Sequence, residues 1–568
     1  MKPIDIQKLF IISGIWGFFV GLMHPHWQLA LEGGQVWAGL VLYPQNNPNV
    51  MYLNHAWTLF HQITGMFLNL GISEKFLTLM ISGLLAMVSI QAISGLVFIF
   101  SRSLPFSVLF PVIYYLLEKK MPLGANYPIM LWDVPHTYGA LSLSLVVLIV
   151  VMYGLKKNWA SGFLLGLLPS IHIAWACFLY LIFFLIFWIV SNRKYQWMSI
   201  LPGLIAGGTI SLVSFIDYRY RCLAFPEISN ALDHYLQAFQ QWDCHRAAIP
   251  VSHPAIWINL FALIYSLSYL RHKKNSSSEQ YIIYAFMTGC SLLGCMGAIL
   301  SHYPDQTPFF IYQLMPTRLL NINGVCFIAC LAGQLTMRIF RGYLLITLAT
   351  AGYLFGYDIT FWIAAFSGTG IYFGISVFRE IFPTPYIRWR SVCVHHFLWK
   401  QMPIILFMMI HIQFIAANLS HIQKFYTHTD TVLEKVHQTK GLLLTASDMM
   451  LIQARTRRPV LLYGESLDML MYALPSAPTV TAILQDIYAV SLFNPPEAVM
   501  HQGGLTRCID QVAWEERSIE EWMKIKEKYH VTHVLTYANY HLNLNLVVKN
   551  EHYALFVIGD SDRSASKQ

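Results

Sequence analysis

Long stretches without a charged side chain constrain this sequence more than any other feature. Phe76–Phe100 contains 25 residues without Asp, Glu, Lys or Arg, and 136–155, 195–216 and 281–300 have the same character. A helix needs about 20 predominantly apolar residues to cross the hydrocarbon core of a membrane. We therefore predict that these stretches are transmembrane helices.

The composition excludes several classes of protein. Of the 568 residues, 56% are hydrophobic and 12% are charged, whereas roughly 25% are charged in an ordinary soluble domain. So little charge cannot cover a soluble protein of this length, which excludes a soluble cytosolic enzyme, a disordered protein and a nucleic-acid-binding protein. The net charge of +8 is spread over loops, where it reports orientation in the membrane.

Two apolar runs are too long for one span and too short for two. Asn158–Asn192 has 35 residues without a charge, and Gly342–Phe378 has 37 residues interrupted only by Asp358. Basic residues flank each run at both ends, and cytoplasmic flanks require the chain to enter the membrane and return. We expect a pair of short re-entrant helices in each run, the first turning within 166–172, where Pro169 ends a helix.

The remaining spans follow by alternation from a cytoplasmic N-terminus. Cytoplasmic loops then hold fifteen Lys and Arg, and the opposite loops up to Arg318 hold seven, which agrees with the positive-inside rule. We expect a mainly α protein with a transmembrane domain of about 13 spans over residues 1–418. The expected spans are 9–23, 76–100, 104–117, 136–155, 159–170, 173–191, 196–216, 253–270, 280–300, 319–337, 342–357, 359–378 and 397–417.

From about residue 420 the composition becomes that of a soluble domain. We expect a linker and helix over 419–454, followed by a small extracytoplasmic α/β domain over 455–568. Strands alternate with turn residues there, and one segment has a helical period. The expected elements are strands at 457–464 and 531–537, an amphipathic helix at 518–529, and hairpin strands at 544–548 and 553–558.

Three large outer loops, 24–75, 217–252 and 301–318, hold most of the candidate functional side chains. Glu32 is the only carboxylate between Asp5 and Glu74 and follows the first span. A carboxyl group in a partly apolar cleft has a raised pKa, which suits a general base. Glu32 therefore either removes a proton from an acceptor hydroxyl or holds a divalent metal, or else it is a solvated residue on an amphipathic helix.

The other candidates each have a structural alternative. Asp133, at the mouth of a span, is either catalytic or a helix cap. Arg318 is at the start of an apolar span and either extends to the membrane interface or binds an anionic head group. Arg246, in the outer loop 217–252, either joins it or is solvated. No P-loop and no zinc-type Cys/His spacing occurs. Four histidines are either cleft-lining or interfacial and buried residues: His24, His26, His136 and His172.

Together these features resemble the class C membrane glycosyltransferases, a superfamily of polytopic membrane enzymes. The resemblance rests on Met23–Gly39 with Glu32, on Leu-Leu-Pro-Ser-Ile-His at 167–172, on Pro-Thr-Arg at 316–318, and on the C-terminal run 522–556. It implies a sugar donor linked to a polyprenyl phosphate, a carboxylate in the first outer loop that acts as base or metal ligand, and basic residues that bind the donor phosphate.

The resemblance also implies a function and a location. The expected protein is an inverting glycosyltransferase of the bacterial inner membrane, with a periplasmic C-terminal domain that positions a glycan, lipid or protein acceptor. Glu32 and Asp133 are the expected catalytic residues, with Arg318 and Arg246 on the donor phosphate. The resemblance implies no certain cofactor and leaves open whether the reaction uses a divalent metal. The alternative is a non-catalytic lipid-binding or flippase-like protein on the same scaffold, which would not need Glu32.

Overall fold

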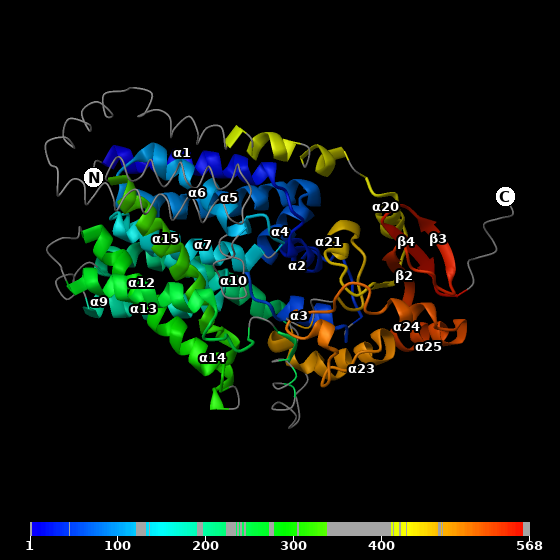
Figure 1. Ribbon diagram of the computed structural model, residues 1–568. Helices are drawn as coiled ribbons and strands as arrows, with labels where there is room; N and C mark the ends of the chain where they lie inside the picture. Colours follow the sequence, from blue (N-terminus) through cyan, green and yellow to red (C-terminus); the bar gives the residue numbers. More distant parts are fainter. Residues whose placement is uncertain are drawn as a thin grey trace, which may run out of the picture.

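The computed structural model is mainly helical, with a small four-stranded sheet near the C-terminus (Figure 1). This agrees with the expected mainly α class and small α/β part. The structure describes residues 3–120, 132–189, 197–222, 246–271, 278–337, 411–463 and 470–559, apart from positions 45, 136, 304, 305, 413, 420, 421 and 428, together with residues 235, 238, 241–243 and 467.

Five helices of the described part are long and apolar enough to cross a membrane. The structure has helices at ten of the expected spans. Five of these ten helices are long and apolar enough to cross a membrane. The expected spans 342–357 and 359–378, and most of 397–417, lie outside the described residues. The five helices are α1 (Pro3–Met23), α5 (Glu74–Ser101), α7 (Thr137–Gly154), α10 (Leu201–Arg221) and α13 (Ser278–Leu300). The other five are α6 (Leu104–Lys120), α8 (Asn158–Leu167), α9 (Ile173–Ile189), α12 (Pro254–Arg271) and α15 (Leu319–Met337).

Helix α5 forms the centre of the helical part. It packs against α1, α6, α7 and α15, and its side chains at Leu96 and Phe100 are fully buried. In contrast, α1 exposes Ile11 and Ile15, and α10 exposes Ile205 among other large apolar side chains. A face this apolar is suited to lipid rather than to water.

A helix break occurs where Pro169 predicts one. Helix α8 has 10 residues and is followed by the short 3-10 helix η1 (Leu168–Ser170) and then by α9. At 1.5 Å per residue α8 is about 15 Å long, which is half the thickness of a bilayer core. Helix α8 is therefore too short to cross a bilayer by itself.

Glycines set the contact between α8 and α10. Gly162 and Gly166 face Gly203 and Gly207, and both pairs have the four-residue spacing that puts small side chains on one helix face. A Cβ on any of them would lie between 2.0 and 2.4 Å from a backbone oxygen of the opposing segment. The two backbones are therefore in direct contact.

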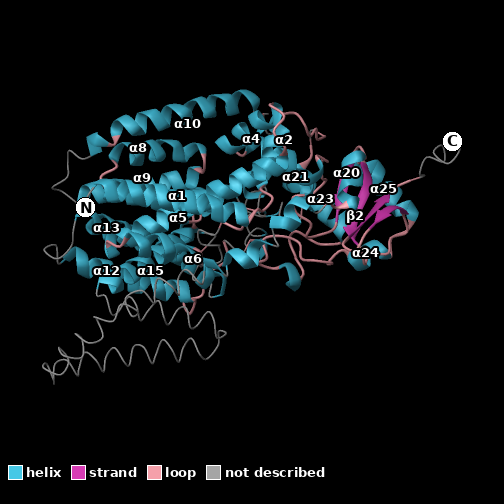
Figure 2. Cartoon of the chain, turned by 90° about the horizontal axis from the view of Figure 1, so that it is seen from above, coloured by secondary structure: helices cyan, strands magenta, loops and turns pink. Residues whose placement is uncertain are grey.

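Short helices fill the first outer loop between the helical part and the C-terminal domain (Figures 1 and 2). Asn47 caps the second of them by accepting hydrogen bonds from two backbone N–H groups, and Thr58 caps the third. In the outer loop 301–318 the chain turns through one helix and one 3-10 turn. These elements are α2 (Leu29–Trp37), α3 (Pro48–His55), α4 (Leu59–Asn69), α14 (Phe309–Leu314) and η6 (Pro316–Arg318).

The C-terminal domain is built around a sheet with strand order β1-β2-β4-β3. The expected strand at 531–537 and the expected hairpin are confirmed. The pair β1 and β2 is parallel, whereas β2–β4 and β3–β4 are antiparallel. The strands are β1 (Leu442–Thr445), β2 (Val531–Tyr537), β3 (Asn545–Lys549) and β4 (Tyr553–Val557). The helices are α20 (Thr431–Gln438), α21 (Ile452–Thr456), α23 (Ala477–Tyr488), α24 (Gln511–Glu515) and α25 (Ile519–Tyr529), the last beginning with the capping box of Ser518 and Glu521.

Two expectations about this domain are corrected. Strand β1 lies within the expected linker 419–454, so the folded unit begins before residue 455. The expected strand at 457–464 is wrong, because within its described part, 457–463, only Val460 forms a bridge, with Leu443. The Val460 carbonyl instead accepts hydrogen bonds from side chains of the first outer loop.

Candidate functional site

The start of α2 fixes the position of Glu32. Gln28 donates a hydrogen bond to the Val134 carbonyl (3.1 Å) and accepts one from the Thr137 hydroxyl (2.8 Å). The Thr137 hydroxyl also accepts a hydrogen bond from the Ala30 N–H at 3.3 Å. Since Gln28 and Thr137 are fully buried, these bonds are shielded from water and anchor α2 to the beginning of α7.

The C-terminal domain covers Glu32, whose side chain is only 2% exposed. The Tyr463 hydroxyl donates a hydrogen bond to Oε1 of Glu32 (2.8 Å), and the Ala454 N–H donates to the same oxygen (3.3 Å). The Gln453 amide donates to the Glu32 backbone carbonyl at 3.0 Å. Glu32 is therefore not a solvated residue of an amphipathic helix.

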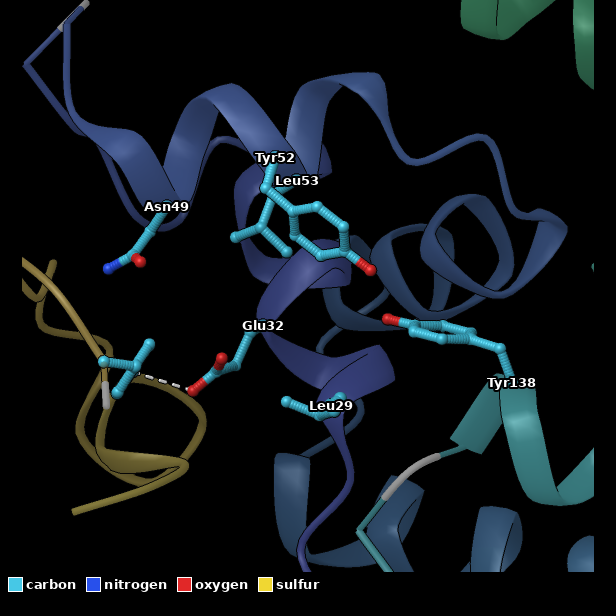
Figure 3. A pocket seen from close by; sticks show the side chains of 7 residues that line it. Leu29, Glu32, Asn49, Tyr52, Leu53 and Tyr138 are labelled. Carbon is cyan, nitrogen blue, oxygen red and sulfur yellow. Dashed lines mark hydrogen bonds between the residues drawn. The ribbon is translucent and has the colours of Figure 1, made fainter. Parts of the chain in front are cut away.

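Glu32 lines a pocket of about 320 Å³ that is partly open to solvent. The hydroxyl groups of Tyr52 and Tyr138 point toward each other across this pocket, and the second carboxyl oxygen of Glu32 faces it (Figure 3). Such a mixture of phenol, carboxyl and apolar groups suits a ligand that carries hydroxyl groups. Its other lining residues are Leu29, Asn49, Leu53 and Tyr463.

Burial raises the pKa of Glu32 to about 7, against the smaller opposing effect of the hydrogen bonds from Tyr463 and Ala454. Burial disfavours the charged form of a carboxyl group, while donors that bind the carboxylate favour it. With a pKa near 7, both protonation states are populated at neutral pH. The group can therefore accept a proton and release it again.

A histidine behind the pocket was not recognised from the sequence. Nε2 of His61 lies 2.5 Å from the Tyr138 hydroxyl, and burial lowers the pKa of His61 to about 3, so its ring is neutral. The His61 ring lies against Gly33, where a Cβ would be 2.1 Å from it. The adjacent glycines 33 and 34 were the available signal, because glycine inside a helix is unfavourable unless another segment approaches closely.

Asp133 belongs to a different cluster. Its carboxylate pairs with Lys119 (2.5 Å) and accepts a hydrogen bond from the Tyr115 hydroxyl (2.7 Å). The His24 ring lies 6.0 Å from the Tyr115 ring, between centroids. The structure therefore brings Asp133 and His24 together at the end of α6, whereas the Glu32 pocket is lined by other residues. His136 lies outside the described residues.

Neither His26 nor His172 is among the described residues that line the Glu32 pocket. The His26 N–H donates a hydrogen bond to the Ser82 hydroxyl at 3.3 Å. The His172 ring follows η1 and lies 6.4 Å from the Trp175 ring. His172 is also within electrostatic range of the buried Arg318, so the helix break at η1 lies near the start of α15.

Arg246 lines a second pocket, of about 310 Å³. Its buried guanidinium pairs with Asp243 and donates a hydrogen bond to the Tyr472 hydroxyl at 3.3 Å. The Tyr472 ring lies 6.4 Å from the ring of Tyr52, which lines the Glu32 pocket. Two tyrosines thus connect the pockets. Residues of the outer loop 301–318 also line the second pocket, among them Ser301, Thr307, Pro316 and Thr317.

The chain matches no protein-family model and no curated protein.

The described residues of the Glu32 pocket do not include the ligands of a metal site. In the described residues, no three His, Cys, Asp or Glu side chains come together in a way that could hold a metal ion. Among the described residues, Glu32 is the single carboxylate that lines this pocket, whereas Mg²⁺ and Ca²⁺ take several oxygen ligands. The arrangement suits proton transfer by one carboxyl group.

Proposed function

We propose that this protein is a membrane glycosyltransferase that moves a sugar from a polyprenyl-phosphate-linked donor to an acceptor hydroxyl. One observation carries the proposal: a buried carboxyl group with a pKa of about 7 lies in a pocket between the apolar helices and the C-terminal domain. A base at this position can reach a lipid-linked donor that enters between helices and an acceptor held by the outer domain.

The proposed reaction uses the ionised form of Glu32. The carboxylate removes the proton of the acceptor hydroxyl, and the acceptor oxygen forms a bond to the anomeric carbon. The bond between that carbon and the phosphate oxygen breaks, and its electron pair leaves with the phosphate. Arg318 and Arg246, both buried, stabilise the charge that develops on the leaving group. Attack opposite to the leaving group inverts the anomeric configuration.

The proposed location follows the distribution of charge along the sequence. We place the chain in the bacterial inner membrane as a class C glycosyltransferase with about 13 spans, a cytoplasmic N-terminus and a periplasmic C-terminal domain. Helix α1 starts at the end of the helical part remote from the C-terminal domain and ends beside it (Figures 1 and 2). That arrangement supports opposite sides for the N-terminus and the C-terminal domain.

Replacement of Glu32 tests the proposal. A strain that lacks the gene is complemented with the wild type, with Glu32→Gln, or with Glu497→Gln, whose side chain is exposed. We expect the envelope glycans of the deletion strain to lack one sugar, and the wild type and Glu497→Gln to restore it. Glu32→Gln should leave at most about 1% of transfer, because general base catalysis contributes 10²- to 10⁴-fold. Full restoration by Glu32→Gln contradicts the proposal.

The second pocket favours one alternative. Arg246, Thr317 and Ser301 surround a space next to apolar helices, which fits an anionic lipid head group and needs no contribution from Glu32. A lipid-binding or flippase-like protein would use this pocket alone. It is the function to adopt if Glu32→Gln restores the wild-type glycans while Arg246→Ala does not.

A further inference from the structure

A short segment of the C-terminal domain, residues 450–463, forms a roof over Glu32. Helix α21 is its centre, and the residues at both ends of this helix, Leu451 and Arg457, have left-handed backbone conformations with φ of 56° and 53°. Residues other than glycine adopt this conformation only when their surroundings impose it, and such residues cluster at functional sites. We call this segment the roof.

We infer that the roof is part of the catalytic apparatus, with Tyr463 and the Ala454 N–H as the groups that position the Glu32 carboxylate. This inference rests on the proposed function and extends it, because the C-terminal domain then completes the site in addition to placing the acceptor. Tyr463 acts through Glu32 and is therefore a positioning residue.

The hydrogen bonds of the roof orient the carboxyl group. Both donors end on Oε1 of Glu32, which leaves the other oxygen facing the pocket (Figure 3). The Tyr463 hydroxyl is itself oriented, because it accepts a hydrogen bond from the Gln453 N–H at 2.8 Å. A donor that also accepts is polarised, and the hydrogen bonds in such a chain strengthen one another.

A salt bridge and several amide groups hold the roof in place. Arg457 makes a two-point contact with Glu74 at the start of α5, with Nε–Oε1 and Nη2–Oε2 distances of 2.6 and 3.1 Å. The Gln35 amide donates both to Glu74 and to the Ala454 carbonyl, at 3.2 Å each. Asn47 donates to carbonyl groups further along the roof. Hydrogen bonds and a salt bridge thus join the roof to the first outer loop and to the start of α5 at several points.

The titratable groups around Glu32 come from every adjoining element. The hydrogen bonds from the roof lower its pKa, and burial raises it. Loss of one donor at constant burial therefore raises the pKa further, whereas entry of water lowers it. Among the described residues, the titratable groups that face Glu32 or its immediate partners are Tyr43, Tyr52, His61, Glu74, Tyr138, Arg457 and Tyr463.

The experiment is an infrared titration of the Glu32 carboxyl group in the full-length protein in lipid nanodiscs, with Glu32→Gln as the reference that assigns its band. We expect Tyr463→Phe to raise the titration midpoint by about one pH unit, since a hydrogen bond to a charged group is lost while burial is kept. Tyr529→Phe is the matched control, because Tyr529 donates to Asp486 on the surface of the same domain. It should leave the midpoint of Glu32 unchanged.

A second variant should shift the titration midpoint of Glu32 in the opposite direction. Arg457→Ala weakens the attachment of the roof and admits water, so the midpoint should fall toward that of an ordinary glutamate. An unchanged or lowered midpoint in folded Tyr463→Phe overturns the inference, as does an unchanged midpoint in Arg457→Ala. The titration needs no substrate. The titration therefore tests the role of the roof independently of the glycan experiment. Only the glycan experiment can show that the proposed function is wrong.

Discussion

Two contacts in this molecule are built in opposite ways. Helices α8 and α10 meet through four glycines, with backbone against backbone. The first outer loop meets the roof through side-chain amides, a tyrosine, a carboxylate and one salt bridge. The helix pair thus shows tight shape matching, whereas the loop and the roof show matched hydrogen-bond donors and acceptors.

The difference follows from the surroundings of each contact. Apolar helices in lipid gain little from burying apolar side chains against each other, so close backbone approach and dispersion stabilise their pairing. At the membrane surface, water competes for every polar group, and a buried contact persists only when its polar groups are paired. The polar contact can therefore respond to pH, and the glycine contact cannot.

The largest expected effect is on the glycine contact. A Cβ on Gly207 would lie 2.0 Å from the Phe163 carbonyl oxygen, whereas a Cβ on the adjacent Gly208 has no neighbour within 4 Å. We expect Gly207→Val to cost at least about 3 kcal/mol, because a rigid backbone cannot give way, and Gly208→Val to fold. The yield of monodisperse protein in detergent measures this. Equal yields would show that the two helices are not in backbone contact.

The second-largest expected effect is the pH dependence of stability that the polar contact between the first outer loop and the roof produces. Between pH 4.5 and about 7 the unfolded chain loses the Glu32 proton while the folded protein keeps it, so wild-type stability falls with rising pH in this window. Glu32→Gln removes the effect. Its stability relative to wild type should increase by about 3 kcal/mol across the window, as followed by thermal unfolding at a series of pH values. A constant difference would contradict the raised pKa.

The smallest effect concerns the salt bridge between loop and roof. We expect Glu74→Gln to destabilise the docked domain by about 1 kcal/mol, since exposed and partly exposed ion pairs contribute little. Limited proteolysis should cleave the roof faster in this variant, more so at low salt than at high salt. Asp486→Asn is the control, because its pair with Lys528 lies on the surface away from the roof. Equal cleavage rates of the two variants would show that the salt bridge between Glu74 and Arg457 does not help to hold the roof in place.

Local patterns predicted much of the fold. Charge-free runs located the long helices, Pro169 located the break before α9, and the alternating residues of Val531–Tyr537 located a strand. Strand β1 was missed because four apolar residues fit a strand or a linker equally well. The segment 457–464 was wrongly expected to be a strand, because the sequence does not show that the bonding partners of the Val460 carbonyl belong to the first loop.

The site was predictable only in part. Glu32 stood out as an isolated carboxylate after the first span, and a partly apolar cleft was one of the two surroundings expected for it. The roof could not be predicted, because Ala454 and Tyr463 are more than 400 residues away in sequence. His61 was missed for a related reason, since its position depends on how closely α4 approaches the glycines of α2.

The distance along the chain between Glu32 and Tyr463 also bears on how the protein is made. The two residues are 431 positions apart, and at about 5–20 residues per second a ribosome needs roughly 20–90 s to synthesise that length. During this time the roof does not exist, so Tyr463 and Ala454 cannot cover Glu32. The burial that raises the pKa of Glu32 is therefore completed only after most of the chain has been synthesised.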